Sequence, residues 1–293
     1  MRIPPSASKQ STQVKGVSVI LCSKNPEICE KAVESIKSTI GIEFEIMVFD
    51  NNDKNWGICK VYNYCAAKAK YKYLCFVHED VILPTPNWGK NMAEFAEKTP
   101  NCGVIGFAGG IIATKNFVGW GAGVETRCRY YEGDRALMLK KDFDVSDLEF
   151  YHHNPENLDF AKVVTLDGLF MFTSYDVWKE NPFDEETIKG FHFYDADFTF
   201  AVAQKRQNYA CMTADVYHFS SGSYDKSFYL AARIFQKKWK DKLPYVIGNE
   251  KISFASEYFS AFYLHKNSVK HGLSLEGCEN HLIEINRGYE MNT

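Results

Sequence analysis

The sequence lacks the features of a membrane-spanning or disulfide-stabilised protein. Its nine cysteines are an odd number, form no Cys-x-x-Cys pair and lie mostly within apolar runs such as residues 73–76, a pattern typical of reduced, buried thiols. No uncharged apolar run approaches the ~20 residues of a membrane span, and the polar first fifteen residues contain no stretch typical of a secretory signal. We therefore expect a soluble, cytoplasmic protein without a transmembrane segment. Peripheral contact with a membrane is the one kind of membrane association that the sequence leaves open.

An excess of positive charge is also missing. Lys and Arg number 34 against 37 Asp and Glu, which gives a formal net charge of −3, and the basic residues are too scattered to form a nucleic-acid groove. The basic cluster in residues 237–242 is interpreted first as a solvated helix face, and second as a surface for anionic lipid. The chain has 293 residues, 45% of them hydrophobic, which is enough for one large domain.

Apolar runs and helical patterns alternate over the first hundred residues. Residues 17–22, 44–49 and 73–77 have the continuous apolar character of strands buried on both faces. Asn25 and Pro26 give a helix start after the first strand, as N-cap and first helical residue. This order predicts βαβ units, and hence an α/β fold with a mainly parallel sheet flanked by helices. The polar residues after each strand should then share one rim, where such sheets bind ligands.

The remaining chain has a less regular pattern. We expect a strand followed by a glycine-rich loop over residues 103–123, and within 161–172 a strand, a sharp turn at Asp167-Gly168 and then a strand or the start of a helix. A helix over 195–208, a strand over 210–217, and helices over 226–242 and about 252–265 should follow. Residues 124–160 receive no assignment. The expected organisation is a disordered leader at 1–15, one domain at 16–224 and a helical extension at 225–293 packed on it.

Carboxylates at the predicted strand ends are candidates for a nucleotide site. Asp80, with Glu79 beside it, follows the third strand, and Asp50 and Asn51 follow the second. A carboxylate there can hold Mg²⁺ or Mn²⁺, and the cation can bridge to phosphates. Any strand must end in polar residues, however, so for each position alone a structural role is the commoner one.

Two acids lie at a predicted helix start among large aromatic residues. Asp195 or Asp197 can act there as a general base for an attacking hydroxyl. The alternative is an N-cap and a first-turn acid that interact with the helix dipole. His218, at the end of a later strand, can ligate a metal or bind phosphate, or can simply be a hydrogen-bonded rim residue.

The order of these motifs resembles the inverting GT-A-type glycosyltransferases of the large family 2 superfamily. The similarity covers roughly residues 16–245. It rests on the second strand, the following helix, the third strand with its polar end, and the later aspartate motifs, at residues 45–51, 63–69, 73–81, 167–185 and 194–198. More narrowly, the segments at residues 78–80, 191–195 and 238–244 look like those of the streptomycin-biosynthesis-protein-like branch.

This resemblance implies a GT-A nucleotide-diphospho-sugar transferase fold and a specific reaction. A sugar would move with inversion from a nucleotide diphosphate, most simply a UDP-sugar, to an acceptor hydroxyl. Asp195 would be the general base, and a divalent metal, Mn²⁺ or Mg²⁺, would lie on the diphosphate. The resemblance further assigns donor binding to Ser23, Asp50, Asn51, Glu79 and Asp80, acceptor binding to Asp167, Gly168 and Asp197, and metal binding to Asp80 and His218.

Two residues depart from the family pattern. His78 replaces the first acid of the metal motif Asp-x-Asp, and Tyr194 replaces the Glu before the base. Either Asp80 and His218 hold the metal together with phosphate oxygens, or metal dependence is weak. The departures also leave open a non-catalytic nucleotide-sugar or carbohydrate-binding protein on the same scaffold. A sugar-nucleotide pyrophosphorylase is a further alternative, although residues 22–26 lack its glycine-rich basic loop.

Overall fold

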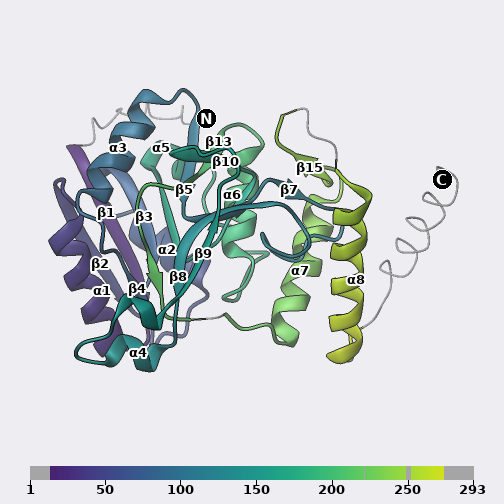
Figure 1. Ribbon diagram of the computed structural model, residues 1–293, viewed down its shortest axis with the longest axis horizontal. Helices are drawn as coiled ribbons and strands as arrows, with labels where there is room; N and C mark the ends of the chain where they lie inside the picture. The colour runs from purple at the N-terminus through teal and green to yellow at the C-terminus, as the bar shows by residue number, and fades with distance from the viewer. Residues whose placement is uncertain (1–13, 221, 249–251, 274–293) are drawn as a thin grey trace, which may run out of the picture.

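The computed structural model describes residues 14–220, 222–248 and 252–273 and is shown in Figure 1. The elements in chain order are β1 (Val14–Ser23), α1 (Pro26–Thr39), β2 (Phe44–Asp50), α2 (Ile58–Ala66), β3 (Tyr71–His78), β4 (Val81–Ile82), α3 (Trp88–Lys98), β5 (Cys102–Gly106), β6 (Ala108–Gly110), β7 (Ile112–Ala113), β8 (Thr126–Glu132), α4 (Arg135–Leu139), the 3₁₀ helix η1 (Val145–Asp147), β9 (Glu149–His153), β10 (Phe160–Val163), β11 (Thr165–Leu166), β12 (Phe170–Ser174), α5 (Tyr175–Glu180), α6 (Tyr194–Ala203), β13 (Gln207–Cys211), β14 (Tyr217–His218), α7 (Lys226–Trp239), β15 (Tyr245–Val246) and α8 (Phe254–Lys270).

A seven-stranded sheet in the order β10-β13-β5-β12-β3-β1-β2 forms the centre of the fold. Strands β1, β2 and β3 pair in parallel, with Ser23 opposite Asp50 and Cys22 opposite His78, so the ends of these strands meet on one rim as predicted. The α/β class is confirmed. The sheet as a whole is mixed rather than mainly parallel, because β12 runs antiparallel to both neighbours and β10 runs antiparallel to β13.

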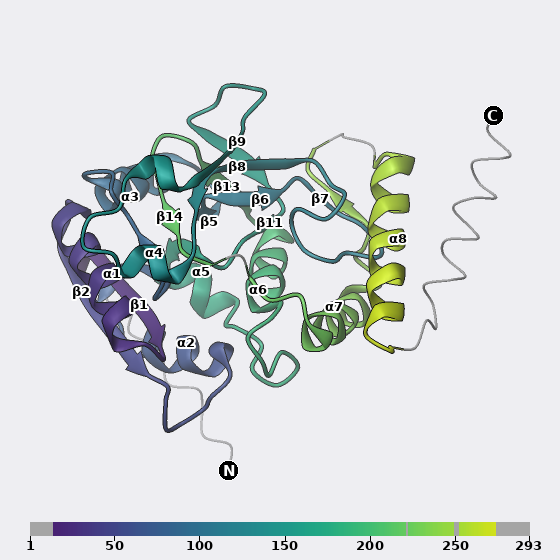
Figure 2. The same ribbon diagram turned by 60° about the horizontal axis from the view of Figure 1, so that its bottom comes forward.

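Helices cover both faces of this sheet (Figure 2). Successive side chains of a strand point to opposite faces, so Val19 and Cys75 pack with α1 and α3, whereas Ile20 and Phe76 pack with α2, α5 and α6. Helix α1 begins as predicted, because the Asn25 side chain accepts a hydrogen bond from the backbone N–H of Ile28. The fully apolar strands are therefore explained by burial on two sides.

A second sheet, in the order β11-β6-β8-β14-β4 with β9 paired to β8, packs beside the first. Its strands β8 and β9 come from residues 124–160, which the sequence pattern left unassigned. Beyond it, α7 and α8 lie side by side in both views and pack against α6 through a core that includes Phe200, Phe235 and Leu264. Within the described residues, no helix is long and apolar enough to cross a membrane.

Two predicted elements end earlier than expected. The helix predicted over residues 195–208 ends at Ala203, and the strand predicted over 210–217 separates into β13 and β14. The side chain of Asn208 explains the first difference: it is fully buried, accepts from the backbone of Val104 and donates to the carbonyls of Val164 and Thr199. These partners fix residue 208 in a strand. Strand β1 begins at Val14, and residues 1–13 of the predicted leader lie outside the described residues.

Candidate functional site

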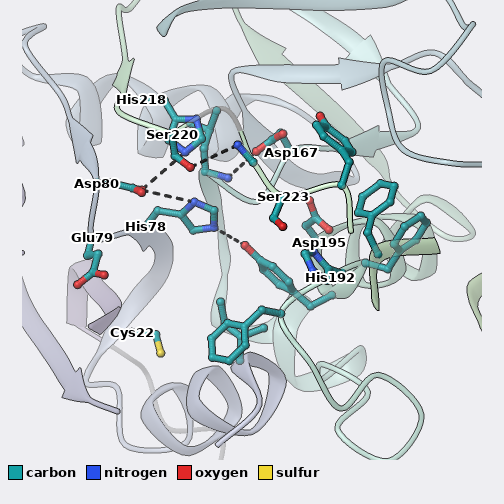
Figure 3. A pocket seen from close by; sticks show the side chains of 18 of the residues that line it. Cys22, His78, Glu79, Asp80, Asp167, His192, Asp195, His218, Ser220 and Ser223 are labelled. Atoms are coloured by element: carbon teal, nitrogen blue, oxygen red, sulfur yellow. Dashed lines mark hydrogen bonds and ion pairs between the residues drawn. The ribbon is translucent and has the colours of Figure 1, made fainter. Parts of the chain in front are cut away.

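A cavity of about 440 Å³ opens at the rim where β1 and β3 end (Figure 3). The loops after these strands, α4, β14 and the start of α6 contribute to its wall. Among the predicted site residues, Glu79, Asp80, Asp167, Asp195 and His218 line it. Five of the sequence-predicted side chains, from segments far apart in the chain, therefore meet in one place.

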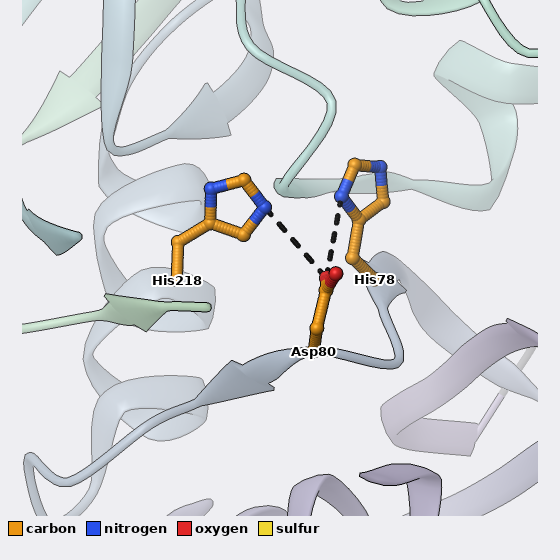
Figure 4. Close-up of side chains that lie close together, drawn as sticks. All are labelled: His78, Asp80 and His218. Carbon is orange, nitrogen blue, oxygen red and sulfur yellow. Dashed lines mark ion pairs between the residues drawn. The ribbon is translucent and has the colours of Figure 1, made fainter. Parts of the chain in front are cut away.

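His78, Asp80 and His218 form a compact cluster on one side of this cavity (Figure 4). The Oδ1 atom of Asp80 lies 3.8 Å from Nδ1 of His78 and 3.6 Å from Nε2 of His218, and the three ligand atoms all lie within 4.8 Å of one another. The Nε2 atom of His218 is buried and has no hydrogen-bond partner among the described residues. A buried nitrogen without a partner is costly unless a ligand satisfies it, so the cluster fits a divalent cation with nitrogen and oxygen ligands.

The carboxylate of Asp80 is buried, with a side-chain exposure of only 4%. Burial alone would raise its pKa, but His78, His218 and Arg135 more than offset this effect and hold the pKa below its usual value. Arg135, at the start of α4, binds the other oxygen, Oδ2, at 2.8 Å and 3.1 Å. The carboxylate thus stays ionised, and its Oδ1 atom faces the two histidines.

The two residues that depart from the family pattern contact each other. Nε2 of His78 lies 2.5 Å from the hydroxyl of Tyr194, and that hydroxyl donates to the carbonyl oxygen of Gly168 at 3.2 Å. If the Tyr194 hydroxyl donates to Gly168, it accepts a hydrogen bond from His78. The imidazole then carries its proton on Nε2, and the lone pair of Nδ1, on the side of Asp80, is free to ligate a cation, as in metal-binding histidines whose other nitrogen donates to an outer partner.

Asp195 lies on the opposite side of the cavity, in the first turn of α6. Burial and the nearby negative charge of Asp167 raise its pKa to about 7, although the backbone N–H of Gly168 donates to its Oδ2 at 2.9 Å. A Cβ atom at residue 168 would lie 2.1 Å from the Tyr194 hydroxyl, so only glycine permits this approach. A carboxylate that titrates near neutral pH is suited to general-base catalysis.

Asp167 has a fixed orientation beside this acid. Its Oδ2 accepts a hydrogen bond from the indole N–H of Trp120 at 2.6 Å, and its Oδ1 accepts from the backbone of Leu169 at 2.8 Å. These contacts hold its carboxylate at the cavity wall. The turn at Asp167-Gly168 was predicted; the contact with Trp120 was not.

Three of the predicted donor-binding residues form structural contacts and do not line the cavity: Ser23, Asp50 and Asn51. Ser23 donates to Glu79 at 2.8 Å, and the same carboxylate accepts from the backbone N–H groups of residues 24 and 25, so it fixes the loop that enters α1. The Asn51 side chain bonds both the N–H and the carbonyl of Trp56, and Asp50 binds Asn52. Neither Asn51 nor Asp50 lines the cavity, although both lie at the same rim of the sheet.

Asp197 is also directed away from the cavity. Two residues along a helix correspond to a rotation of about 200°, so Asp195 and Asp197 lie on opposite faces of α6. Asp197 accepts from Nζ of Lys238 and from the indole N–H of Trp239, each at 2.8 Å. The expected acceptor role of Asp197 is thus not supported, and Lys238, expected on a solvated face, reaches inward to it.

The comparison with protein families gives one match that covers most of the chain. The model of a family described as "Glycosyltransferase like family" matches residues 18–226. The chain belongs to this family. Among curated proteins, none matches the sequence significantly.

Three solved structures are similar to this glycosyltransferase-like chain at low sequence identity. GalNAc-T7, crystallised with UDP, GalNAc and Mn²⁺, is 11% identical with a TM-score of 0.53, and the alignment covers 94% of this chain and 55% of the other. TarS residues 1–349 from S. aureus is 14% identical with a TM-score of 0.49, covering 87% and 72%. A197 from STIV is 15% identical with a TM-score of 0.37, covering 71% and 87%. The expected GT-A fold is confirmed.

Sequence reasoning missed several residues of the glycosyltransferase-like site. Arg135 and Tyr130 come from the segment left unassigned, and Trp120 and Tyr224 come from loops. Short strands and a five-residue helix carry little periodic signal. These residues are brought to the cavity by long-range pairing of the second sheet, which a local pattern does not encode.

Proposed function

We propose that this protein transfers a sugar from a UDP-sugar to an acceptor hydroxyl with inversion, in the presence of Mn²⁺ or Mg²⁺. The observation that carries the proposal is that Asp195, with a pKa raised to about 7, shares one cavity with the cluster of His78, Asp80 and His218. The family match supports sugar transfer, and the similarly folded GalNAc-T7 was crystallised with UDP and Mn²⁺.

The residues on the two sides of the cavity would divide the chemistry between them. His78, Asp80 and His218 would hold the cation, which supplies positive charge to the departing diphosphate. Lys24 and Arg135, which also line the cavity, would add further positive charge for the donor phosphates.

Asp195 would accept the proton of the acceptor hydroxyl on the other side. As the acceptor oxygen forms its bond to the anomeric carbon, the bond from that carbon to the diphosphate oxygen breaks, and UDP leaves with the electron pair. A single displacement of this kind inverts the anomeric centre. The contact between His78 and Tyr194 supports a working site over a non-catalytic scaffold, because the two departures together form a ligand and its hydrogen-bond partner. Membership of the streptomycin-biosynthesis-protein-like branch and a cytoplasmic location remain predictions.

The proposal is tested by calorimetric titration of UDP with Mn²⁺ or with EDTA, together with turnover of UDP-sugars. Wild type should bind UDP more tightly with Mn²⁺, and Asp80→Asn should remove this difference. Asp80 is buried, so asparagine is chosen because it keeps the side-chain volume and removes only the charge.

Asp50→Asn is the matched control: its carboxylate is exposed at the same rim but does not line the cavity, so the Mn²⁺ effect should persist. An unchanged Mn²⁺ effect in Asp80→Asn contradicts the metal site. Absence of both nucleotide binding and turnover with wild type contradicts the function.

A further inference from the structure

A second cavity, of about 450 Å³, adjoins the first. It is enclosed by the loop of residues 118–123, by β8, by the start of α6 and by residues of α7 and α8. Both cavities are lined by the same seven residues, Trp120, Tyr130, Asp167, Phe193, Asp195, Tyr224 and Phe228. Asp195 therefore lies at the junction, where a ligand in the second cavity can present a hydroxyl to it.

The two cavities differ in their basic residues. The first is lined by Lys24, Arg135 and three histidines as well as by five acids, which include Asp167 and Asp195. No Lys, Arg or His is among the described residues that line the second, whose acids are Asp167 and Asp195. An anionic ligand there would face two carboxylates without a compensating cation. Phosphates therefore belong in the first cavity, and the second cavity favours a ligand without negative charge.

Aromatic rings form much of the second cavity's wall. Trp120, Tyr130, Tyr224, Phe228 and Tyr263 all line it. Trp120 is held in place by its hydrogen bond to Asp167 and by an edge-on contact with the ring of Tyr130, at 6.3 Å between centroids. Flat apolar surfaces with a few fixed polar groups are suited to a ligand that has an apolar face and a polar edge. A pyranose ring has this character, with its C–H face and its rim of hydroxyl groups.

Part of this wall lies outside the family domain. The family match ends at residue 226, whereas Phe228 and Tyr263 belong to α7 and α8. Helix α8 also fixes the loop, because Ser260 donates to the carbonyl of Ala122 at 3.0 Å and a Cβ atom at Gly123 would lie 2.8 Å from Cβ of Phe259. The helical extension thus shapes the cavity directly.

We infer that the second cavity binds the acceptor as a neutral pyranose residue stacked on aromatic side chains, and that α7 and α8 determine which acceptor fits. This inference rests on the proposed function, since it assigns the hydroxyl that Asp195 deprotonates. The expected stacking residues are Trp120, in the loop of residues 118–123, and Tyr263, in α8.

Saturation-transfer NMR with methyl glycosides tests the inference in the presence of UDP and Mn²⁺. The panel contains neutral methyl hexosides and a methyl N-acetylhexosaminide, with a methyl glucuronide and a hexose 6-phosphate as anionic counterparts. We expect at least one neutral glycoside to bind, and the anionic sugars to bind at least tenfold more weakly or not at all. Tyr263→Ala should weaken binding of the neutral sugar about tenfold and leave UDP affinity unchanged, because Tyr263 lines the second cavity and not the first.

Tyr64→Ala is the matched control, because Tyr64 is an exposed aromatic residue of α2 that lines neither cavity. Its sugar binding should equal that of wild type. If UDP binds but no neutral glycoside does, or if an anionic sugar binds best, the inference is overturned while the proposed function stands. If wild type does not bind UDP at all, the proposed function itself fails. Thermal unfolding of each variant shows whether it has folded.

Discussion

At the residue scale, the site depends on how each side chain is held rather than on which side chains are present. His78 replaces an acid of the family motif, yet Tyr194 orients its ring. Asp195 and Asp197 are chemically identical and two residues apart, but one lines the cavity and the other binds Lys238. Partners and orientation therefore assign the roles.

Replacing Tyr194 with Phe removes only the hydroxyl that contacts His78. Because outer partners of metal-binding histidines set their orientation, we expect Mn²⁺ affinity to fall about tenfold, as measured by titration followed by electron paramagnetic resonance. Tyr62→Phe is the matched control: Tyr62 lines the same cavity, but its buried hydroxyl forms no hydrogen bond with the part of the chain that the structure describes. Equal Mn²⁺ affinities in the two variants would rule out an orienting role for Tyr194.

The pH dependence of turnover should report the ionisation of Asp195. Its pKa of about 7 means that the base is protonated below that pH, so kcat/KM should rise with pH and level off above about 7. Asp195→Asn should lower kcat by about 10²–10⁴-fold and lose this rise, with little change in UDP affinity.

Asp197→Asn serves as the comparison, since Asp197 lies on the other face of α6. It should keep both the turnover and the pH profile. If Asp195→Asn retains near-normal turnover, the base is another residue, and Asp167 becomes the next candidate.

At the element scale, α6 connects the site to the helical extension. One face of the helix packs on the central sheet through Phe198 and Val202, and the other packs against α7 and α8 through Phe200 and Ala203. Lys238 of α7 adds ionic contacts to Asp197 at 2.8 Å and to Asp184 at 2.6 Å. The proposed base, Asp195, is thus carried by a helix that is buried on two sides.

Lys238→Met should destabilise the packing of α7 on α6. Asp197 is buried, and without Lys238 its carboxylate keeps only the indole N–H of Trp239 as a side-chain donor. We expect a loss of about 2 kcal/mol in the free energy of unfolding, measured by urea denaturation. Lys237→Met removes the preceding, exposed lysine and should change the stability by less than about 0.5 kcal/mol. Equal losses in the two variants would contradict the role of Lys238.

At the scale of the whole molecule, the sequence predicts the first half of the fold better than the second. Strands buried on both faces and amphipathic helices have clear periods, so β1, α1, β2, α2 and β3 were found, with the polar ends of the strands on one rim. The antiparallel pairing of β12 with β3 and β5 was not predicted, because the residues of a strand do not specify whether it pairs in a parallel or an antiparallel direction. The short strands of the second sheet were missed for lack of periodic signal.

The same distinction applies to the candidate site. Asp80, His218, Asp167 and Asp195 were predicted and meet at one cavity, because motif order reflects the spatial order of strand ends. The structural use of Asn51 was not predictable, since its amide bonds the backbone of Trp56 in a loop without a repeating pattern. The contact of His78 with Tyr194 joins residues 116 positions apart, and only the folded chain shows that they are neighbours.

The raised pKa of Asp195 sets activity against thermodynamic stability. An ordinary aspartate has a value of 3.8, and in the folded chain the value is about 7, so between these limits the native state binds its proton more tightly than the unfolded chain does. The resulting stabilisation is fully present below about pH 4 and is lost as pH rises through 7. The molecule therefore gives up part of its folding free energy over the same pH range in which the proposed base becomes ionised, as expected of a function–stability trade-off.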